Sequence, residues 1–388
     1  MARIGVAGVG RIGRMHAGTL GSLPGVDELL IADAVPEQAR LVAAEVGGRA
    51  VGDVAELLAA GIDGLVVAAP TDAHADVVSR AVEAGVTVFC EKPLAAGVEQ
   101  SVKLARWIAE SGGRVQIGFQ RRFDAGYAAV REAVVGGRLG RVHTLRGLTA
   151  DPAPPPAAFI KNSGGIFRDC SVHDFDAIRW VTGREVVEVQ AIGSDAGADF
   201  FREYGDVDTA AALLRLDDDA IALVSATRYN GAGYDVRLEA HGSLGSLAAG
   251  FDERLPLPSA ERGVDWPAGP PYGGFMERFQ HAYVAELAAF VQFATGGSQS
   301  DRGLGAGSGS GSRAESGKAE EGGTLGLGGD RRERGQARAI GPRAQPPVPG
   351  RSESPCSVED SLEALYVAEA CELSRREHRP VAVGEVRP

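Results

Sequence analysis

The stretch Arg3-Ile-Gly-Val-Ala-Gly-Val-Gly-Arg-Ile-Gly13 decides the fold of this chain. Its first half is a short apolar run typical of a buried strand, and a helical pattern begins a few residues later. Between them, Gly8 permits a tight turn, Gly10 lets a pyrophosphate approach the backbone, and Gly13 lets helix and strand pack closely. The stretch therefore predicts a dinucleotide-binding β-α unit, with the phosphates at the N-terminus of the helix.

A second feature strengthens this interpretation, because a lone GxGxxG is weak evidence in a chain with 54 glycines. The apolar run Glu28–Ala32 leads into Asp33, twenty residues after Gly13. An acid at this spacing is placed to bind both ribose hydroxyls of an adenosine and to repel a 2′-phosphate. We therefore predict NAD, and not NADP, as the cofactor. An ordinary loop aspartate after a strand is the alternative.

Strands and helices continue to alternate along the first third of the chain. Buried strands are expected at Gly64–Ala69, Val86–Cys90 and Val115–Phe119, with a helix beginning near His74. Repeated β-α units with short connections predict a parallel, doubly wound sheet of the Rossmann type. The loop 70–74 and the turn Glu91-Lys92-Pro93 follow carboxyl ends of strands, where open α/β sheets bind their ligands.

Three polar side chains suggest proton chemistry. Asp169 and His173 stand four residues apart, so a helix from about Arg168 would place both on one face. A carboxylate there can orient the imidazole as a proton acceptor, although a helix start with a satisfied histidine is the structural alternative. Lys92 precedes a proline, and the sequence allows a cis peptide bond there. A lysine held in this way can stabilise the negative charge of a developing alkoxide.

Three motifs now coincide: Gly8-x-Gly10-x-x-Gly13, Glu91-Lys92-Pro93 and Gly164-Gly165-x-x-x-Asp169-x-x-x-His173. Together they resemble the Gfo/Idh/MocA oxidoreductase family, named for glucose–fructose oxidoreductase and inositol dehydrogenase. The sequence of residues 165–174, with Gln120-Arg-Arg-Phe-Asp124 upstream, is most similar to that of the inositol 2-dehydrogenase group. The likeness runs from the start of the chain to about residue 296 and resumes near Cys356.

This resemblance implies NAD-dependent oxidation of a cyclitol, myo-inositol at its C2 hydroxyl, to a 2-keto-inositol without a metal. It implies a catalytic set of Lys92, Asp169 and His173, with His173 as the base. The cofactor-binding residues are then Gly8, Gly10, Arg11, Ile12, Gly13, Asp33, Ala69, Pro70, Thr71, His74 and Glu91. A looser likeness points to substrate contacts at Arg122, Asp151, Tyr234 and Tyr283. Tyr283 also fits a core position, and Asp151 also fits the start of a turn.

Beyond about Gln120 the pattern changes to β-type runs, at Val186–Ile192, Thr209–Leu216, Ala220–Tyr229 and Tyr234–His241. The acidic turn Asp217–Asp219 favours a hairpin between two of them. We expect an α+β domain with a largely antiparallel open sheet. The predicted division is a NAD-binding Rossmann domain at 1–121 and a substrate-binding and oligomerisation domain at 122–388. The resemblance alone implies a homo-oligomer, a dimer or a tetramer.

Residues 297–355 contain no aromatic residue and no apolar periodicity, and are rich in Gly, Ser, Arg, Glu and Pro. Such a composition cannot bury enough surface to offset its ordering entropy, so we expect a disordered insertion between two helices. A functional linker and a reading-frame artefact are alternative explanations.

Composition limits the partners and the compartment. A net charge of −12 over 388 residues argues against nucleic acid or an anionic membrane. The four cysteines are widely spaced and no leader pattern is recognisable, which predicts a reduced, cytoplasmic protein. Two functional alternatives remain open. One is a dehydrogenase for a hexose, scyllo-inositol or an amino-inositol, and the other is a non-catalytic nucleotide sensor.

Overall fold

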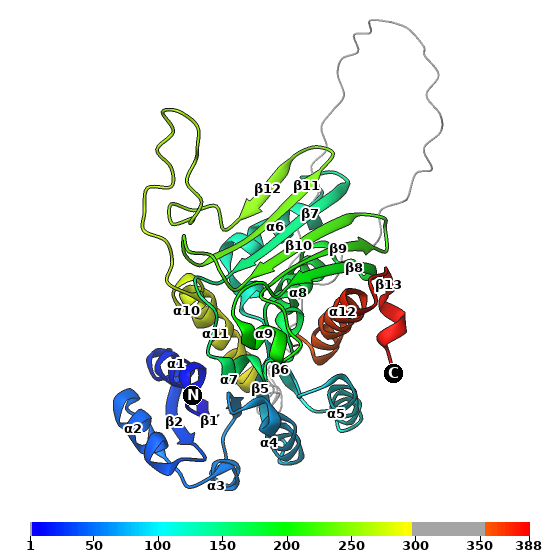
Figure 1. The fold of residues 1–388 in the computed structure, drawn as a ribbon. Helices are drawn as coiled ribbons and strands as arrows, with labels where there is room; N and C mark the ends of the chain where they lie inside the picture. The colour runs from blue at the N-terminus through cyan, green and yellow to red at the C-terminus, as the bar shows by residue number, and fades with distance from the viewer. Residues whose placement is uncertain (1, 297–353) are drawn as a thin grey trace, which may run out of the picture.

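The computed structural model describes residues 2–296 and 354–388, which form two β-sheets with helices around them (Figure 1). The first sheet has six parallel strands in the order β3-β2-β1-β4-β5-β6. This is the doubly wound Rossmann order, and it confirms the predicted parallel sheet. The strands are β1 (Ala2–Ala7), β2 (Val26–Ala32), β3 (Arg49–Ala50), β4 (Gly64–Val67), β5 (Thr87–Glu91) and β6 (Val115–Gly118).

Helices cover both faces of this sheet because its strands are almost wholly apolar. One core contains Ile4, Leu20, Val42 and Phe290, and the other contains Leu65, Val78 and Ile117. The helices of this part are α1 (Arg11–Ser22), α2 (Pro36–Val46), α3 (Val54–Ala59), α4 (Thr71–Glu83) and α5 (Val98–Glu110).

The second sheet has seven strands in the order β12-β11-β7-β10-β9-β8-β13. Every neighbouring pair is antiparallel except β7 and β10, so the expected largely antiparallel open sheet is confirmed. The expected hairpin at Asp217–Asp219 joins β9 to β10. The strands are β7 (Val142–Ala150), β8 (Val186–Ser194), β9 (Thr209–Leu216), β10 (Ile221–Thr227), β11 (Asp235–Gly242), β12 (Ser246–Ala249) and β13 (Val381–Ala382).

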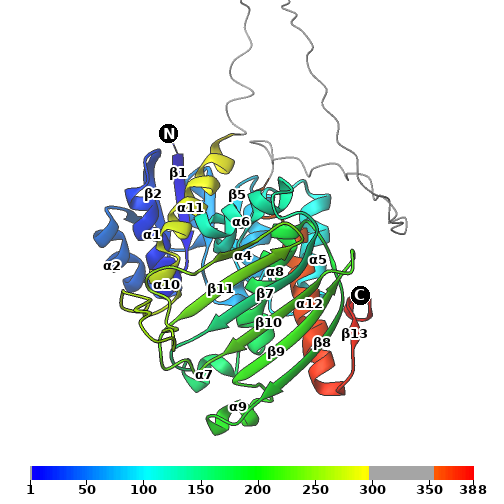
Figure 2. The same cartoon turned by 90° about the horizontal axis from the view of Figure 1, so that it is seen from above.

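Three long helices cover one face of this sheet, and Figure 2 shows the sheet broadside with these helices behind it. They are α6 (Ala125–Val135), α8 (Val172–Thr182) and α12 (Val358–Glu377). The shorter helices are α7 (Ala157–Ile160), α9 (Asp199–Glu203) and α10 (Phe275–Arg278), with 3-10 turns at η1 (Gln120–Phe123) and η3 (Val383–Val386) and a π-helical turn at η2 (Phe167–Ser171).

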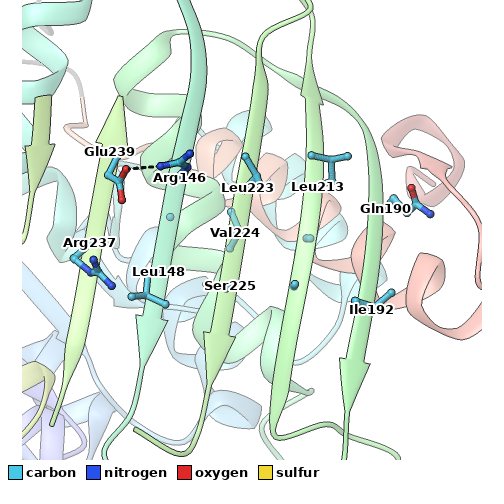
Figure 3. Close-up of a pocket in the computed structure, with 13 residues that line it drawn as sticks. Arg146, Leu148, Gln190, Ile192, Leu213, Leu223, Val224, Ser225, Arg237 and Glu239 are labelled. Carbon is cyan, nitrogen blue, oxygen red and sulfur yellow. Dashed lines mark hydrogen bonds and ion pairs between the residues drawn. The ribbon is translucent and has the colours of Figure 1, made fainter. Parts of the chain in front are cut away.

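The other face of the second sheet is open. Along β9 exposed and buried residues alternate strictly, as expected for a sheet packed on one side. The open face is nevertheless apolar at several positions, and Ile192 is 67% exposed. Figure 3 shows Leu148, Leu213 and Leu223 on neighbouring strands of a shallow pocket, beside the ion pair Arg146–Glu239.

Two helices from the second half of the chain also pack on the first sheet. Helix α11 (Gln280–Gly296) inserts Leu287 and Phe290 into the core beside β1 and β4, and α12 contributes Ala364 to the core on the opposite face. The predicted boundary between 121 and 122 falls inside η1. The division into 1–121 and 122–388 therefore stays a prediction.

The expected disordered insertion falls almost entirely on residues 297–353, which lie outside the described residues. Within residues 2–296 and 354–388, no helix is both long enough and apolar enough to cross a membrane.

Candidate active site

The glycine loop between β1 and α1 has the geometry that an anionic ligand needs. A Cβ on Gly13 would lie 1.9 Å from the carbonyl oxygen of Gly8, and one on Gly8 (φ 89°) would lie 2.6 Å from Ala69. A Cβ on Gly10 would meet nothing within 4 Å. Gly8 and Gly13 are therefore fixed by packing, whereas Gly10 faces open space. This is the arrangement expected if a pyrophosphate approaches at Gly10.

Asp33 is held against this loop. Its Oδ2 accepts a hydrogen bond from the backbone N–H of Val9 at 2.7 Å, and its Oδ1 accepts one from Val35 at 2.8 Å. The first turn of α1 has no side-chain cap, so its N–H groups are available to an anion. A free helix N-terminus, an open Gly10 and an oriented acid together fit the pyrophosphate and ribose of a dinucleotide.

His74 joins two loops at the same edge of the sheet. The ring is 2% exposed, with Nδ1 at 2.8 Å from the carbonyl oxygen of Pro93 and Nε2 at 2.9 Å from that of Ala69. Burial lowers the pKa of His74, but the Cys90 thiol and the two carbonyl acceptors outweigh it and raise the pKa to about 9. A doubly protonated ring satisfies both acceptors. The ring of His74 thus serves loop positioning, and it retains no free nitrogen for the cofactor contact expected of it.

The remaining expected cofactor residues lie around this edge. Ala69 and Pro70 form the turn into α4, which begins at Thr71 without a side-chain cap. Glu91, at the end of β5, pairs with the buried His16 of α1, with Oε1 at 2.6 Å from Nε2. This contact ties the end of β5, directly before Lys92, to the helix that follows the glycine loop.

Lys92 and Asp169 are in direct contact. Lys92 follows β5 through a cis bond to Pro93, and its Nζ donates to Oδ1 of Asp169 at 3.1 Å and to the backbone oxygen of Asp169 at 2.9 Å. Oδ2 of Asp169 accepts from Nη2 of Arg228 at 2.7 Å. Burial raises the pKa of the Asp169 carboxyl, but the charges of Lys92 and Arg228 outweigh it and hold the pKa below its ordinary value. Asp169 is therefore a carboxylate with both oxygens engaged.

The expected contact between Asp169 and His173 is not formed. The sequence predicts an α-helix from about Arg168, but the segment opens with the π-helical turn η2, and α8 begins only at Val172. A π turn has more residues than an α turn, so an i,i+4 pair no longer stacks on one face. Within the described residues Nδ1 of His173 is buried without a hydrogen-bond partner, and the ring meets Phe119 edge-on at 5.5 Å.

His173 nevertheless has the electrostatic setting of a neutral imidazole. Burial lowers its pKa well below 6.5, the positive charges of Lys92 and Arg121 lower it further, and Asp169 only partly opposes them. The ring lies half-buried at the start of α8. A neutral imidazole at pH 7 can accept a proton.

Two of the four expected substrate residues lie near this cluster. Asp151 follows β7, and its Oδ2 accepts from Nη1 of Arg228 at 2.8 Å. Tyr234 precedes β11 and is buried, and its pKa is raised by that burial and also by the nearby charge of Asp151, against the opposing charge of Arg121. Their role as substrate contacts stays a prediction.

The other two expected substrate residues are engaged inside the fold. Arg122 is buried between α8 and α12, with Nη2 at 2.6 Å from Oδ1 of Asp176 and Nη1 at 2.9 Å from Oδ2 of Asp360. Its donors serve this structural bridge, which corrects the expectation of a substrate contact. Tyr283 of α11 is buried in the core, with its ring 5.8 Å from that of His16, as the core interpretation allows.

Sequence reasoning missed two arginines of this region, Arg121, whose charge acts on His173, and Arg228, which contacts Asp169. Arg228 bridges Asp151 and Asp169, and Arg121 is wholly buried with Nη1 at 2.6 Å from Oδ1 of Asp174 and Nη2 at 2.8 Å from Oγ1 of Thr149. Arg121 belongs to the motif 120–124, whose likeness to the family gives this arginine no individual role, and Arg228 directly follows a strand. Its pairing with Asp151 depends on the strand order, which no local pattern reveals.

Comparison with known proteins identifies the family. Residues 2–119 match the model described as "Oxidoreductase family, NAD-binding Rossmann fold", and residues 127–248 match that of the GFO/IDH/MocA C-terminal domain. The chain is 41% identical over 295 residues to the myo-inositol dehydrogenase Hyg17 of Streptomyces leeuwenhoekii, covering 76% of this chain and 89% of the relative.

Solved structures agree with this. A myo-inositol dehydrogenase from Corynebacterium glutamicum superimposes with a TM-score of 0.77 at 32% identity, covering 98% of both chains. A scyllo-inositol dehydrogenase from Lactobacillus casei, solved with NAD(H) and scyllo-inositol, superimposes with a TM-score of 0.76 at 27% identity, covering 99% of both chains. The chain therefore belongs to the Gfo/Idh/MocA family of oxidoreductases, with NAD as the cofactor of its Rossmann-fold part.

Proposed function

We propose that this protein is an NAD-dependent inositol 2-dehydrogenase, which oxidises the C2 hydroxyl of myo-inositol to a ketone. The observation that carries the proposal is the cluster of Lys92, Asp169 and His173 at the carboxyl edge of the NAD-binding sheet. Support comes from relatives that are named for inositol oxidation, including an inositol 2-dehydrogenase of Rhizobium meliloti at 35% identity.

The reaction removes a hydride from the carbon and a proton from its hydroxyl. NAD, when bound, supplies the hydride acceptor. The hydroxyl proton passes to His173, whose depressed pKa keeps the ring neutral and able to accept it. Because Nδ1 is sealed inside the protein, Nε2 is the nitrogen that we assign to this step.

Lys92 has the complementary role of stabilising negative charge. Its ammonium, fixed by two oxygen atoms of Asp169, retains a third N–H for the reacting hydroxyl oxygen. A preorganised cation at this point favours the alkoxide that develops as the proton leaves. In this scheme Asp169 orients Lys92 and does not orient His173.

The cofactor contacts are proposed from the same geometry. Gly8, Gly10 and Gly13, with the N–H groups of Arg11 and Ile12, would hold the pyrophosphate, and Asp33 the adenosine ribose. Ala69, Pro70 and Thr71 line the neighbouring turn, with Glu91 behind it. We propose Asp151 and Tyr234 as substrate contacts. We do not propose Arg122 and Tyr283, because both are engaged inside the fold.

The decisive test measures NADH formation by the purified protein with a panel of myo-inositol, scyllo-inositol, an amino-inositol and aldohexoses. We expect the highest kcat/KM with myo-inositol and NAD. A higher value with scyllo-inositol or a hexose would assign another member of the substrate class to the same site. Tight NADH binding with no turnover on any polyol would instead support a nucleotide sensor.

We also propose that two copies pair through the open face of the second sheet. This face presents Leu213 and Leu223 beside a cationic and an anionic group, Arg146 and Glu239. In a two-fold dimer the leucines of the two copies can pack together, and Arg146 of each copy can approach Glu239 of the other. Light scattering after gel filtration should report a dimer or a tetramer, and Leu213→Glu should shift it towards monomer. A monomeric wild-type protein would refute the proposal.

A further inference from the structure

Arg228 and Asp151 are brought together by the topology of the second sheet. Strands β7 and β10 run parallel, and their last residues, Ala150 and Thr227, are register partners. Asp151 and Arg228 are the next residues along each strand, so both emerge at the same edge. The edge is fixed by backbone bonds, since the N–H of Asp151 donates to the carbonyl oxygen of Thr227 at 2.9 Å.

The guanidinium of Arg228 connects this edge to Lys92. Nη1 donates to Oδ2 of Asp151 at 2.8 Å and Nη2 donates to Oδ2 of Asp169 at 2.7 Å, while Oδ1 of Asp169 accepts from Lys92 at 3.1 Å. The result is a chain of four charges, Asp151–Arg228–Asp169–Lys92, in which two carboxylates balance two cations. Arg228 is only 3% exposed, so these contacts are poorly screened by solvent.

We propose that Arg228 is a positioning residue of the dehydrogenase site: it holds the carboxylate of Asp169 so that Lys92 points at the substrate hydroxyl, and it ties this pair to Asp151. The inference rests on the proposed function and deepens it. A fork of two N–H donors can bind two carboxylates in fixed directions, whereas the ammonium of a lysine is a compact charge without that geometry.

The arrangement has a consequence for His173. Among the described residues, the charged groups that face this ring are Lys92 after β5, Arg121 in η1 and Asp169 in η2, and the charge of Asp169 is in turn balanced by Arg228. Removing the positive charge of Arg228 leaves the negative charge of Asp169 less compensated. The pKa of His173 should therefore rise, and protonation should inactivate the base at a higher pH than in the wild type.

The test compares Arg228→Lys, which keeps the charge and loses the fork, with Arg228→Met, which loses both. Activity is measured on myo-inositol and normalised to the number of NADH-binding sites. For Arg228→Lys we expect kcat to fall about 100-fold, the loss that an ångström of misplacement can produce, with NADH affinity unchanged. The acid limb of kcat/KM should stay in place for Arg228→Lys and move to higher pH for Arg228→Met.

Arg179→Lys is the matched control. Arg179 is also buried and also holds a carboxylate through two nitrogens, Nε and Nη2 to Glu185 at 2.7 and 2.8 Å, but it makes no contact with Lys92 or Asp169. Its kcat should be within about twofold of wild type. Wild-type kcat in Arg228→Lys, or an equal loss in Arg179→Lys, would overturn the proposal, because the effect would then be absent or merely structural.

A second measurement separates this proposal from the proposed function. The titration of His173, followed by NMR in protein with labelled histidine, needs no substrate. If the wild type oxidises no polyol, the proposed function fails, yet a raised pKa of His173 in Arg228→Met would still support the electrostatic role of Arg228. An unchanged pKa would refute that role whatever the substrate is. If Arg228→Met does not fold, the kcat of Arg228→Lys decides alone.

Discussion

Two single-methyl substitutions in the glycine loop should separate folding from cofactor binding. In Gly13→Ala the new Cβ would lie 1.9 Å from the carbonyl oxygen of Gly8, whereas ordinary contact begins at 3.4 Å, so backbone atoms must move by about 1.5 Å. Overpacking of this kind costs roughly 1–3 kcal/mol. In Gly10→Ala the new Cβ meets nothing within 4 Å, so the free energy of unfolding should change by less than about 0.5 kcal/mol.

Cofactor affinity should respond to the substitution that leaves stability unchanged, Gly10→Ala. The methyl group of Gly10→Ala fills the space that we assign to the pyrophosphate, so NADH affinity should fall about tenfold or more, which corresponds to about 1.4 kcal/mol. Thermal unfolding without cofactor measures the first effect, where each kcal/mol corresponds to roughly 1–2 °C in Tm for a chain of this size. Fluorescence titration with NADH measures the second. Wild-type affinity in Gly10→Ala would refute the phosphate site, and a wild-type Tm in Gly13→Ala would refute the packing argument.

Four further predictions concern single groups. His173→Ala should lower kcat by roughly 10²–10⁴-fold and leave NADH affinity unchanged, and near-normal turnover would remove His173 as the base. The acid limb of kcat/KM should have its midpoint below pH 6.5, because the pKa of His173 is depressed, and a midpoint above 6.5 would contradict that setting. Asp33→Ala should raise the NADP-to-NAD ratio of kcat/KM at least about tenfold, and an unmoved ratio would contradict the ribose assignment. The pKa of His74 is raised from 6.5 to about 9, so roughly 3 kcal/mol of stability present below pH 6.5 should be lost as pH rises through 9. Denaturant unfolding of His74→Gln should lack this alkaline loss.

The first sheet could be predicted closely because its information is local. The apolar runs, the glycine fingerprint and Asp33 each lie within one β-α unit, and they predict five of the six strands. The edge strand β3 (Arg49–Ala50) was not predicted, because two residues form no apolar run. The hairpin at 217–219 was equally local. The parallel pairing of β7 with β10 could not be predicted locally, because α8 and two further strands separate them in the sequence.

The same distinction explains what was missed at the site. Periodicity places Asp169 and His173 on one helical face only if the helix is regular, and the π turn at Phe167–Ser171 removes that condition. No residue pattern in this segment marks a π turn. The partner that Asp169 does have, Arg228, lies 59 positions away in the sequence, and only the strand order brings it close.

Lys92 shows why the site needs both sheets. On the side of the first sheet, His74 binds the carbonyl oxygen of Pro93 and so fixes the backbone that carries the lysine. On the side of the second sheet, Asp169 binds Nζ and is itself held by Arg228. Contacts on the side of the first sheet thus position the backbone of Lys92, and contacts on the side of the second sheet position its ammonium group. Neither set of contacts positions both the backbone and the ammonium group. A shift of one sheet against the other would therefore misplace the ammonium group even with the cofactor loop intact. Loss of kcat without loss of NADH affinity is therefore the expected mark of any substitution that disturbs the second sheet at Arg228.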